Sequence, residues 1–158
     1  MFLSLRCILC ILYIHDNFKL NYYMNYRSDL YKHHILDLAK NPSNYGLKQE
    51  VDFLSKKLNP SCGDIITIGG CIKDKKIYDV CFEASGCVIS IAMASLLTDF
   101  VKDKDMSCIL RLDEEIVEQL LDMQLGINRL QCGMLSVMAL QDGVRNFIQK
   151  SAASLEPS

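Results

Sequence analysis

The sequence has no excess of basic charge. Its 17 Lys and Arg residues are outnumbered by 19 Asp and Glu, and the formal net charge is −2. Proteins that bind nucleic acid cluster Lys and Arg on one face, so we expect no nucleic-acid partner. The runs at residues 73–76 and 102–105 mix both signs, which is typical of solvated turns.

Long apolar stretches are also lacking. The apolar run at residues 7–14 is shorter than the roughly 20 residues that span a bilayer, and no small-x-small cleavage site follows it. Only Arg6 precedes Asp16, unlike the Arg-rich pattern of a mitochondrial transit peptide. We therefore expect a cytoplasmic protein with no membrane partner. Residues 1–27 form an atypical apolar and tyrosine-rich extension. We expect either that the start of the chain is misassigned or that this extension is dispensable.

The remaining composition is that of a globular protein, with 50% hydrophobic and 23% charged residues. A chain of 158 residues can bury a core in one domain, which we place at residues 28–150, followed by a disordered tail at 151–158. Eight cysteines without an evident secretory signal indicate a reducing compartment with free thiols. We assign no metal or redox role to the CxxC of Cys7 and Cys10.

Periodicity and turn signals predict the order of the elements. Ser28 should cap a helix that ends near Lys40, before Asn41-Pro42. Three strands are expected to follow, and then three helices. The predicted strands are 50–57, 64–72 and 76–84, and the predicted helices are 88–101, 114–125 and 133–150.

The last two strands should form a hairpin. Ile66, Ile68 and Ile72 share one face of the first strand, and Tyr78, Val80 and Phe82 share one face of the second. Both sets face the core together if the loop has three residues, at 73–75. Cys71 and Cys81 then point to the other face, and we expect them to take no part in a site.

Three cysteines lie beside glycines at predicted element ends: Cys62 in PSCGD, Cys87 in SGCVIS and Cys132 in LQCG. Glycine lets the backbone approach a ligand closely, and Asp64 lies on the same side of an extended segment as Cys62. Predicted positions at helix N-termini favour a thiolate at Cys87 and Cys132.

Any one of these cysteines could be a buried small hydrophobe, but the three together indicate a metal site. Three sulfurs and one oxygen suit tetrahedral Zn²⁺. Three thiolates with one replaceable ligand also suit a labile iron–sulfur cluster.

These motifs resemble the U-type iron–sulfur scaffold family, which includes IscU, SufU and the N-terminal part of NifU. The resemblance runs over residues 30–149 and rests on LYKHHILDLAKNPSNYG, NPSCGD and DVCFEASGCVISIAMAS. It implies an α+β fold, with helices packed against a three-stranded antiparallel sheet. It also implies a scaffold that accepts sulfur from a cysteine desulfurase, builds a [2Fe–2S] cluster and passes it to apo-proteins. Cys62, Asp64, Cys87 and Cys132 match the family's cluster or zinc ligands.

The chain departs from the family pattern near its last ligand. Gln131 stands where Isc-type members have histidine and Suf-type members often have lysine. No LPPVK-like motif precedes Cys132, so we do not expect docking of the Isc-type Hsp70 chaperone. The Isc or Suf subtype stays open.

The matching residues are compatible with two functions. The first is a cluster scaffold without turnover of its own, which carries a transient [2Fe–2S] cluster and Fe²⁺. The second is a zinc-dependent sulfur acceptor, in which Zn²⁺ holds the same four residues. There a desulfurase residue replaces one ligand and frees Cys132 as the nucleophile. A metal-regulated interaction protein is a third, more distant alternative. Cys132 is the predicted persulfide acceptor.

Overall fold

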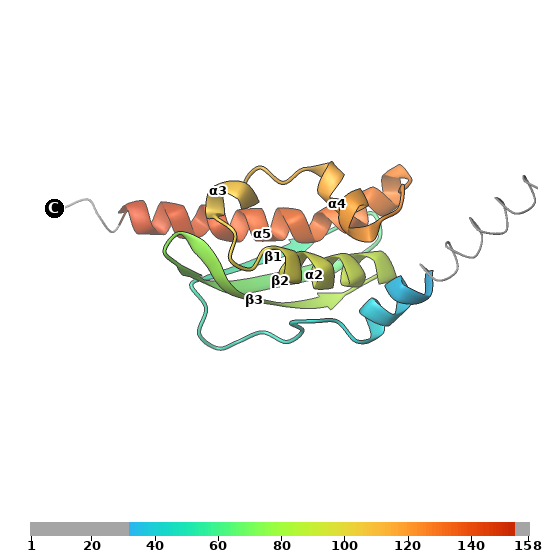
Figure 1. The fold of residues 1–158 in the computed structure, drawn as a ribbon, viewed down its shortest axis with the longest axis horizontal. Coiled ribbons are helices and arrows are strands. Elements are labelled where there is room, and N and C mark those ends of the chain that lie inside the picture. The colour runs from blue at the N-terminus through green and yellow to red at the C-terminus, as the bar shows by residue number, and fades with distance from the viewer. Residues whose placement is uncertain (1–31, 154–158) are drawn as a thin grey trace, which may run out of the picture. The chain divides into compact units, whose positions relative to one another are not determined.

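The computed structural model describes residues 32–153. The expected extension at residues 1–27 lies outside this range. Residues 35–153 form one compact unit, shown in Figure 1. After a helix at residues 32–40, its elements are β1 Phe53–Leu58, β2 Ile65–Lys73, β3 Lys76–Ser85, α2 Val88–Phe100, α3 Met106–Ile109, α4 Glu114–Leu121 and α5 Ile127–Ala153.

The three strands form one antiparallel sheet in the order β1-β2-β3. α5 packs on β1 and β2, α2 packs on β3, and the two helices contact each other. Apolar side chains of the sheet and both helices meet in a closed core, which includes Ile68, Phe82, Met93, Leu97 and Leu140. Burying each such side chain contributes about 1.5–3 kcal/mol. The predicted α+β fold is confirmed.

The β2–β3 hairpin differs from the prediction in its turn. The loop has two residues, Asp74 and Lys75, both with positive φ, as the tight turns that suit sheet twist require. The pairing then shifts by one residue, because Ile72 pairs with Ile77 while Cys71 pairs with Asp79. This bulge leaves Tyr78 unpaired, so Ile77 is buried in its place and Tyr78 is 65% exposed. The prediction that Tyr78 faces the core is wrong.

The turn after the first helix is anchored by Asn44, which adopts a left-handed conformation at φ 57°. Its side-chain amide donates to Thr98 Oγ1 and to Asp99 Oδ1 of α2, and the Ser43 N–H donates to Ser95 Oγ. The backbone of Asn44 also accepts from the N–H of Phe82 on β3. The NPSNYG motif therefore fastens this segment to α2 and β3, and its role is structural.

The predicted boundaries of the last two helices are wrong. α4 ends at Leu121, because Asp122 takes the left-handed conformation that stops a helix. α5 begins at Ile127 rather than at Gly133. Gly133 lies inside α5, where an added Cβ would come 2.4 Å from Cγ1 of Val117. This glycine therefore allows α4 and α5 to approach closely.

The far end of α5 also differs from expectation. The helix continues to Ala153, three residues into the range expected as a tail. Met138 of this helix is 39% exposed.

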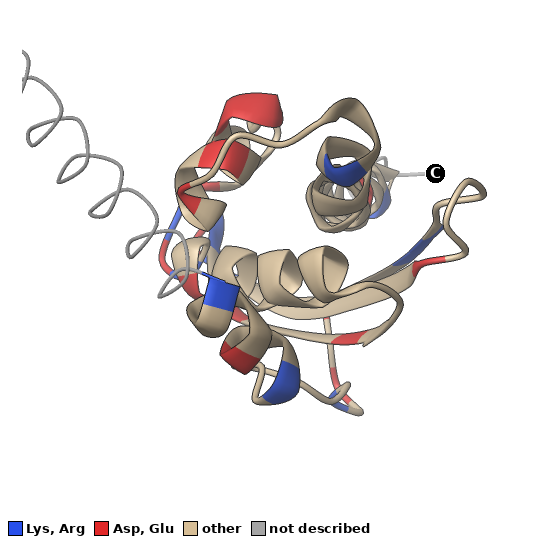
Figure 2. Ribbon diagram, turned by 90° about the vertical axis from the view of Figure 1, so that its right-hand side faces the viewer, with Lys and Arg blue, Asp and Glu red and all other residues tan. Residues whose placement is uncertain are grey.

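Figure 2 shows basic residues scattered over several elements rather than gathered on one. Phosphate-binding surfaces gather such residues into a patch or stripe. Within residues 32–153, the helices are too short or too polar to cross a bilayer.

Candidate metal centre

The loop between β1 and β2 carries the first two candidate ligands, and Asn59 shapes it. The Asn59 N–H donates to the Asp64 carbonyl at 2.8 Å, and the Asn59 carbonyl accepts from the N–H of Gly63 at 2.8 Å. The Asn59 side chain also accepts from the N–H of Ser61. Gly63 has φ +75°, in the left-handed region that favours glycine. The loop therefore turns tightly, which leaves Cys62 exposed and returns Asp64 to the interior.

Asp64 is only 2% exposed, yet both of its carboxylate oxygens have hydrogen-bond donors. The Cys87 N–H donates to Oδ1 at 3.0 Å, and the Ser90 hydroxyl donates to Oδ2. Burial alone would raise the pKa of the Asp64 carboxyl, but hydrogen bonds from Ser90, Cys87 and Cys62 outweigh it and lower the pKa. Asp64 is therefore a carboxylate at neutral pH.

Gly86 makes room for this carboxylate. A Cβ at residue 86 would lie 2.6 Å from both Cγ and Oδ1 of Asp64, far inside contact distance. The glycine of the SGC motif thus lets the backbone before α2 lie directly against the Asp64 side chain.

Cys87 is the N-cap residue of α2, as its predicted place before the helix required. Its backbone is extended, and its sulfur accepts from the Ser90 N–H at 3.5 Å. The thiol is half-buried. Cys87 therefore contributes to the site in two ways. Its N–H donates to Asp64, and its sulfur lies at the start of a helix.

Cys132 does not precede a helix, contrary to the prediction. It lies in the second turn of α5 and is 7% exposed. Burial, the hydrogen bond with Cys62 and the neighbouring charge of Cys87 raise the pKa of the Cys132 thiol well above its usual value. The expected stabilisation of its thiolate by a helix N-terminus is therefore wrong. This thiol needs a metal ion or a partner before it becomes a thiolate.

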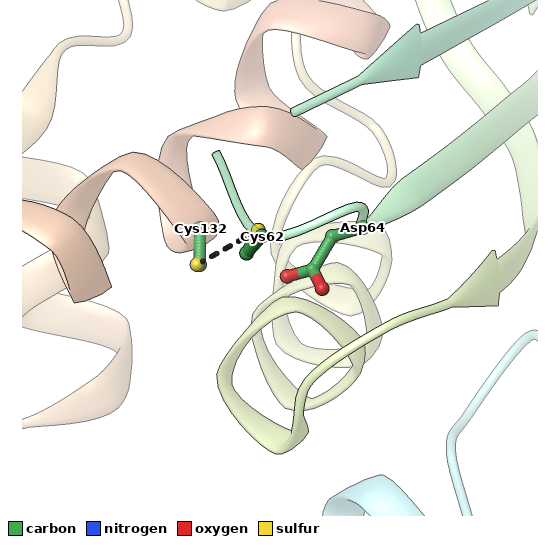
Figure 3. A group of neighbouring side chains, drawn as sticks. All are labelled: Cys62, Asp64 and Cys132. Carbon is green, nitrogen blue, oxygen red and sulfur yellow. Dashed lines mark hydrogen bonds between the residues drawn. The ribbon is translucent and has the colours of Figure 1, made fainter. Parts of the chain in front are cut away.

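Three of the four predicted ligands converge. The sulfurs of Cys62 and Cys132 and one oxygen of Asp64 all lie within 4.8 Å of one another. In Figure 3, Cys62 and Asp64 come from the β1–β2 loop, and Cys132 comes from α5. The Cys87 sulfur is outside this group but lies 3.5 Å from the Ser90 hydroxyl that contacts Asp64. The fourth predicted ligand therefore lies at the edge of the site.

The donor set fits a borderline metal ion. The two sulfurs are 3.5 Å apart, and two sulfurs bound to one Zn²⁺ at 2.3 Å with a tetrahedral angle lie about 3.8 Å apart. Thiolates suit zinc and iron, and the carboxylate adds a harder donor. Cys62, Asp64 and Cys132 could therefore hold one ion with small side-chain adjustments.

A groove of about 650 Å³ runs beside these residues, between the β1–β2 loop and the first turns of α5. Leu58, Leu130 and Met134 line it with apolar surface, and Gln131 lies in it, exposed, next to Cys132. The residue that replaces the family's histidine or lysine therefore faces an open surface beside the site.

Sequence reasoning missed the residues that support the ligands, namely Ser90, Asn59 and the specific role of Gly86. One signal was available for Ser90, because a residue three positions after an N-cap faces back toward the cap. Its contact with Asp64 depends on how α2 packs, which spacing along the sequence does not reveal.

The fold and the site together define a small α+β domain with a cluster of thiols and a carboxylate that could hold a metal ion. Residues 30–154 match the family model of the NifU-like N-terminal domain, and the chain belongs to this family. The predicted relationship to the U-type scaffold proteins is thereby confirmed.

Relatives with assigned functions include both a scaffold protein and a zinc-dependent sulfurtransferase. The chain is 30% identical over 122 residues to the iron–sulfur cluster assembly scaffold protein IscU 1 of Archaeoglobus fulgidus, with 77% of this chain and 79% of the relative covered. It is 32% identical over 132 residues to the zinc-dependent sulfurtransferase SufU of Bacillus subtilis, with 73% and 89% covered. The solved N-terminal structure of a nitrogen-fixing NifU-like protein from Brucella abortus shares the fold, with a TM-score of 0.60, 19% identity, and 74% and 93% covered.

Proposed function

We propose that this protein is an iron–sulfur cluster assembly scaffold of the cytoplasm. It accepts sulfur from a cysteine desulfurase, builds a [2Fe–2S] cluster on Cys62, Asp64, Cys87 and Cys132, and transfers the cluster to apo-proteins. The observation that carries this proposal is the convergence of two sulfurs and one carboxylate oxygen within 4.8 Å. The function of relatives such as the Archaeoglobus protein supports it.

The exposure of the donors suits a cargo, here the iron–sulfur cluster, that is assembled on the protein and later transferred. Cys62 is exposed while Asp64 and Cys132 are buried, so one side of the cluster would face solvent and the other would be protected. A carboxylate is a harder donor than a thiolate and holds iron less firmly. Asp64 would therefore keep one iron open to exchange, as transfer to a recipient requires.

Sulfur delivery to Cys132 needs no external oxidant or reductant. The Cys132 thiol gives its proton to a basic group of the bound desulfurase, and its sulfur attacks the outer sulfur of a persulfide on the desulfurase cysteine. A new S–S bond forms on Cys132, the old S–S bond breaks, and the desulfurase cysteine leaves as a thiolate. The exposed Cys62 sulfur lies 3.5 Å from Cys132, so it is the competing acceptor that an experiment must distinguish.

The groove beside the thiols supports a protein partner as the sulfur source. Its apolar lining at Leu58, Leu130 and Met134 is accessible next to Cys132. Apolar surface with a few polar groups is usual for a recognition site. We place the desulfurase contact along this groove, and recipient proteins at the exposed Cys62.

The proposed function is tested by anaerobic reconstitution with ferrous iron and sulfide, followed by visible absorption and iron and sulfide analysis. Wild type should give a brown protein with two irons and two sulfides per cluster. Cys132→Ser should lose the cluster, whereas Cys108→Ser should keep it, because Cys108 is an exposed cysteine on α3 outside the group of converging ligands. Equal cluster yield in both variants would refute the proposal.

A second candidate is a zinc-dependent sulfurtransferase, and one observation favours it. The chain is 32% identical to the zinc-dependent sulfurtransferase SufU of Bacillus subtilis, and Cys62, Asp64 and Cys132 could hold one Zn²⁺ as well as a cluster. When bound, zinc would lower the thiol pKa of its ligands and so supply a thiolate at neutral pH. Metal analysis of the protein purified without oxygen decides between the two: one zinc and no sulfide favours this candidate.

A further inference from the structure

Ser90 connects the separate parts of the site, although sequence patterns gave it no role. It lies in the first turn of α2 and is completely buried. Its hydroxyl donates to Asp64 Oδ2, lies 3.2 Å from the backbone carbonyl of Cys132, and lies 3.5 Å from the Cys87 sulfur. One side chain therefore touches three of the four predicted ligands, from the β1–β2 loop, α5 and the N-cap of α2.

The hydroxyl of Ser90 has one proton and, besides the Cys87 sulfur, two oxygen acceptors close to it. The Asp64 carboxylate and the Cys132 carbonyl can only accept, so the proton serves one of them at a time. The Asp64 contact is the shorter one, and a hydrogen bond to a charged acceptor is stronger than one to a neutral carbonyl. Without a metal ion the Ser90 hydroxyl therefore donates its hydrogen bond to Asp64.

The other oxygen of Asp64 is fixed in the same way. The Cys87 N–H donates to Oδ1 at 3.0 Å, so the two bonds together set the rotation of the carboxylate. A carboxylate oxygen has lone pairs for more than one partner, which leaves Asp64 able to bind an ion while these bonds persist. The backbone of α2 cannot be changed by substitution, but the Ser90 hydroxyl can.

We propose that Ser90 is a positioning residue that aims the Asp64 carboxylate at the sulfurs of Cys62 and Cys132. The proposal rests on the proposed function, because it assigns Asp64 to the metal or cluster. If a bound ion draws Oδ2 away, the hydroxyl can turn its proton to the Cys132 carbonyl, which already lies within hydrogen-bond distance. Ser90 then keeps a partner in both states, so Asp64 can bind and leave the ion without stranding a buried hydroxyl.

A purely structural role would have a different signature. Ser90 fills space between α2 and α5, and loss of its hydroxyl could weaken metal binding simply by loosening the core. In that case the loss would occur with or without Asp64. If Ser90 acts through Asp64, its removal has an effect only while the carboxylate is present, and a double-mutant cycle separates the two cases.

The experiment measures Zn²⁺ affinity by chelator competition in the full chain for wild type, Ser90→Ala, Asp64→Asn and the double variant. Ser90→Ala should weaken Zn²⁺ binding about 10–100-fold, the usual effect of losing a hydrogen bond to a metal ligand. In the Asp64→Asn background the same change should cost less than about threefold. Ser90→Thr keeps the hydroxyl and should restore most of the affinity.

Two controls make the reading specific. Ser95→Ala removes another buried serine of α2, whose hydroxyl accepts from the Ser43 N–H away from the site, and should leave Zn²⁺ affinity unchanged. Co²⁺ in place of Zn²⁺ adds a spectroscopic readout. Ser90→Ala should shift the visible d–d bands as Asp64→Asn does, while Ser95→Ala should not.

Equal losses from Ser90→Ala in the two backgrounds, or an unshifted Co²⁺ spectrum, would overturn the Ser90 proposal and leave the proposed function intact. Failure of wild type to bind Zn²⁺ or Co²⁺ through Cys62 and Cys132, together with no cluster on reconstitution, would instead refute the proposed function and this proposal with it. If Ser90→Ala does not fold, Ser90→Val is compared with Ser90→Thr, because the two side chains have the same shape and only threonine has a hydroxyl.

Discussion

The sulfurs of Cys62 and Cys132 lie 3.5 Å apart, although 70 positions separate the two residues in the chain. The contact joins an exposed loop to a buried turn of α5. The exposed Cys62 thiol thus lies beside the buried Cys132 thiol. Sulfur held on Cys132 would be shielded from solvent, and this is the basis of the first prediction.

Cys132 should be the principal persulfide acceptor. After incubation with a cysteine desulfurase and cysteine, mass spectrometry should find the added sulfur on the peptide that contains Cys132. Replacing Cys132 by Ser should remove most of it. Cys108→Ser serves as the matched control and should change nothing. Full persulfuration at Cys62 or Cys87 in the Cys132→Ser protein would show that the assignment is wrong.

Removal of the Asp64 carboxylate should have opposite consequences for the two possible cargoes. Asp64→Ala should lengthen the lifetime of a reconstituted cluster and slow its transfer to an apo-ferredoxin, because the exchangeable ligand is gone. It should weaken Zn²⁺ retention at least about tenfold. Decay of visible absorbance and competition with a zinc chelator measure the two effects. If neither quantity changes, Asp64 is not a ligand.

Gly86→Ala should damage the site more than the fold. The new Cβ would lie 2.6 Å from Asp64 Cγ, so the carboxylate must move from its two donors, at a cost of about 1–3 kcal/mol. We expect a modest fall in the thermal midpoint and a clear loss of metal affinity. Gly126→Ala is the control, since a Cβ there meets no atom within 4 Å. Equal metal affinity for the two variants would contradict the prediction.

Deletion of residues 1–23 should leave folding and metal binding intact. These residues precede the matched family domain at 30–154 and lie outside the described residues. Thermal unfolding of the full and shortened chains provides the measurement. About 1 kcal/mol moves the midpoint by only a few degrees in a domain of this size, so a drop of many degrees would show that the segment belongs to the core.

The sequence was sufficient where local chemistry determines geometry. Cys62 could be placed on the loop between the first two strands because glycine and proline mark such turns. The expected extended segment from Cys62 to Asp64 is wrong, because Gly63 between them has a positive φ. Cys87 could be placed at the start of a helix because an apolar helical pattern begins directly after it. The approach of Cys62, Asp64 and Cys132 could be expected only from the family resemblance.

The prediction failed where tertiary packing overrides a local signal. Gly133 looks like a helix boundary, yet it lies inside α5 because Val117 of α4 occupies the space that a side chain would need. Tyr78 has the alternation of a core residue, but a bulge shifts the register at that point. Both errors concern spacing between elements, to which a pattern along one segment is insensitive.

The loop of residues 59–63 has consequences for the order in which a cargo is released. It is closed by hydrogen bonds through Asn59, whereas Asp64, Cys87 and Cys132 adjoin or belong to the sheet and the two long helices. Displacing Cys62 therefore disrupts no strand or helix. Unloading should begin at the solvent side, where the bond between the metal and the Cys62 sulfur breaks. Cys87 and Cys132 should then retain the cargo while the iron held by Asp64 accepts the first ligand from a recipient. This order of ligand exchange keeps the cargo bound to protein ligands throughout delivery and so limits its release into solvent.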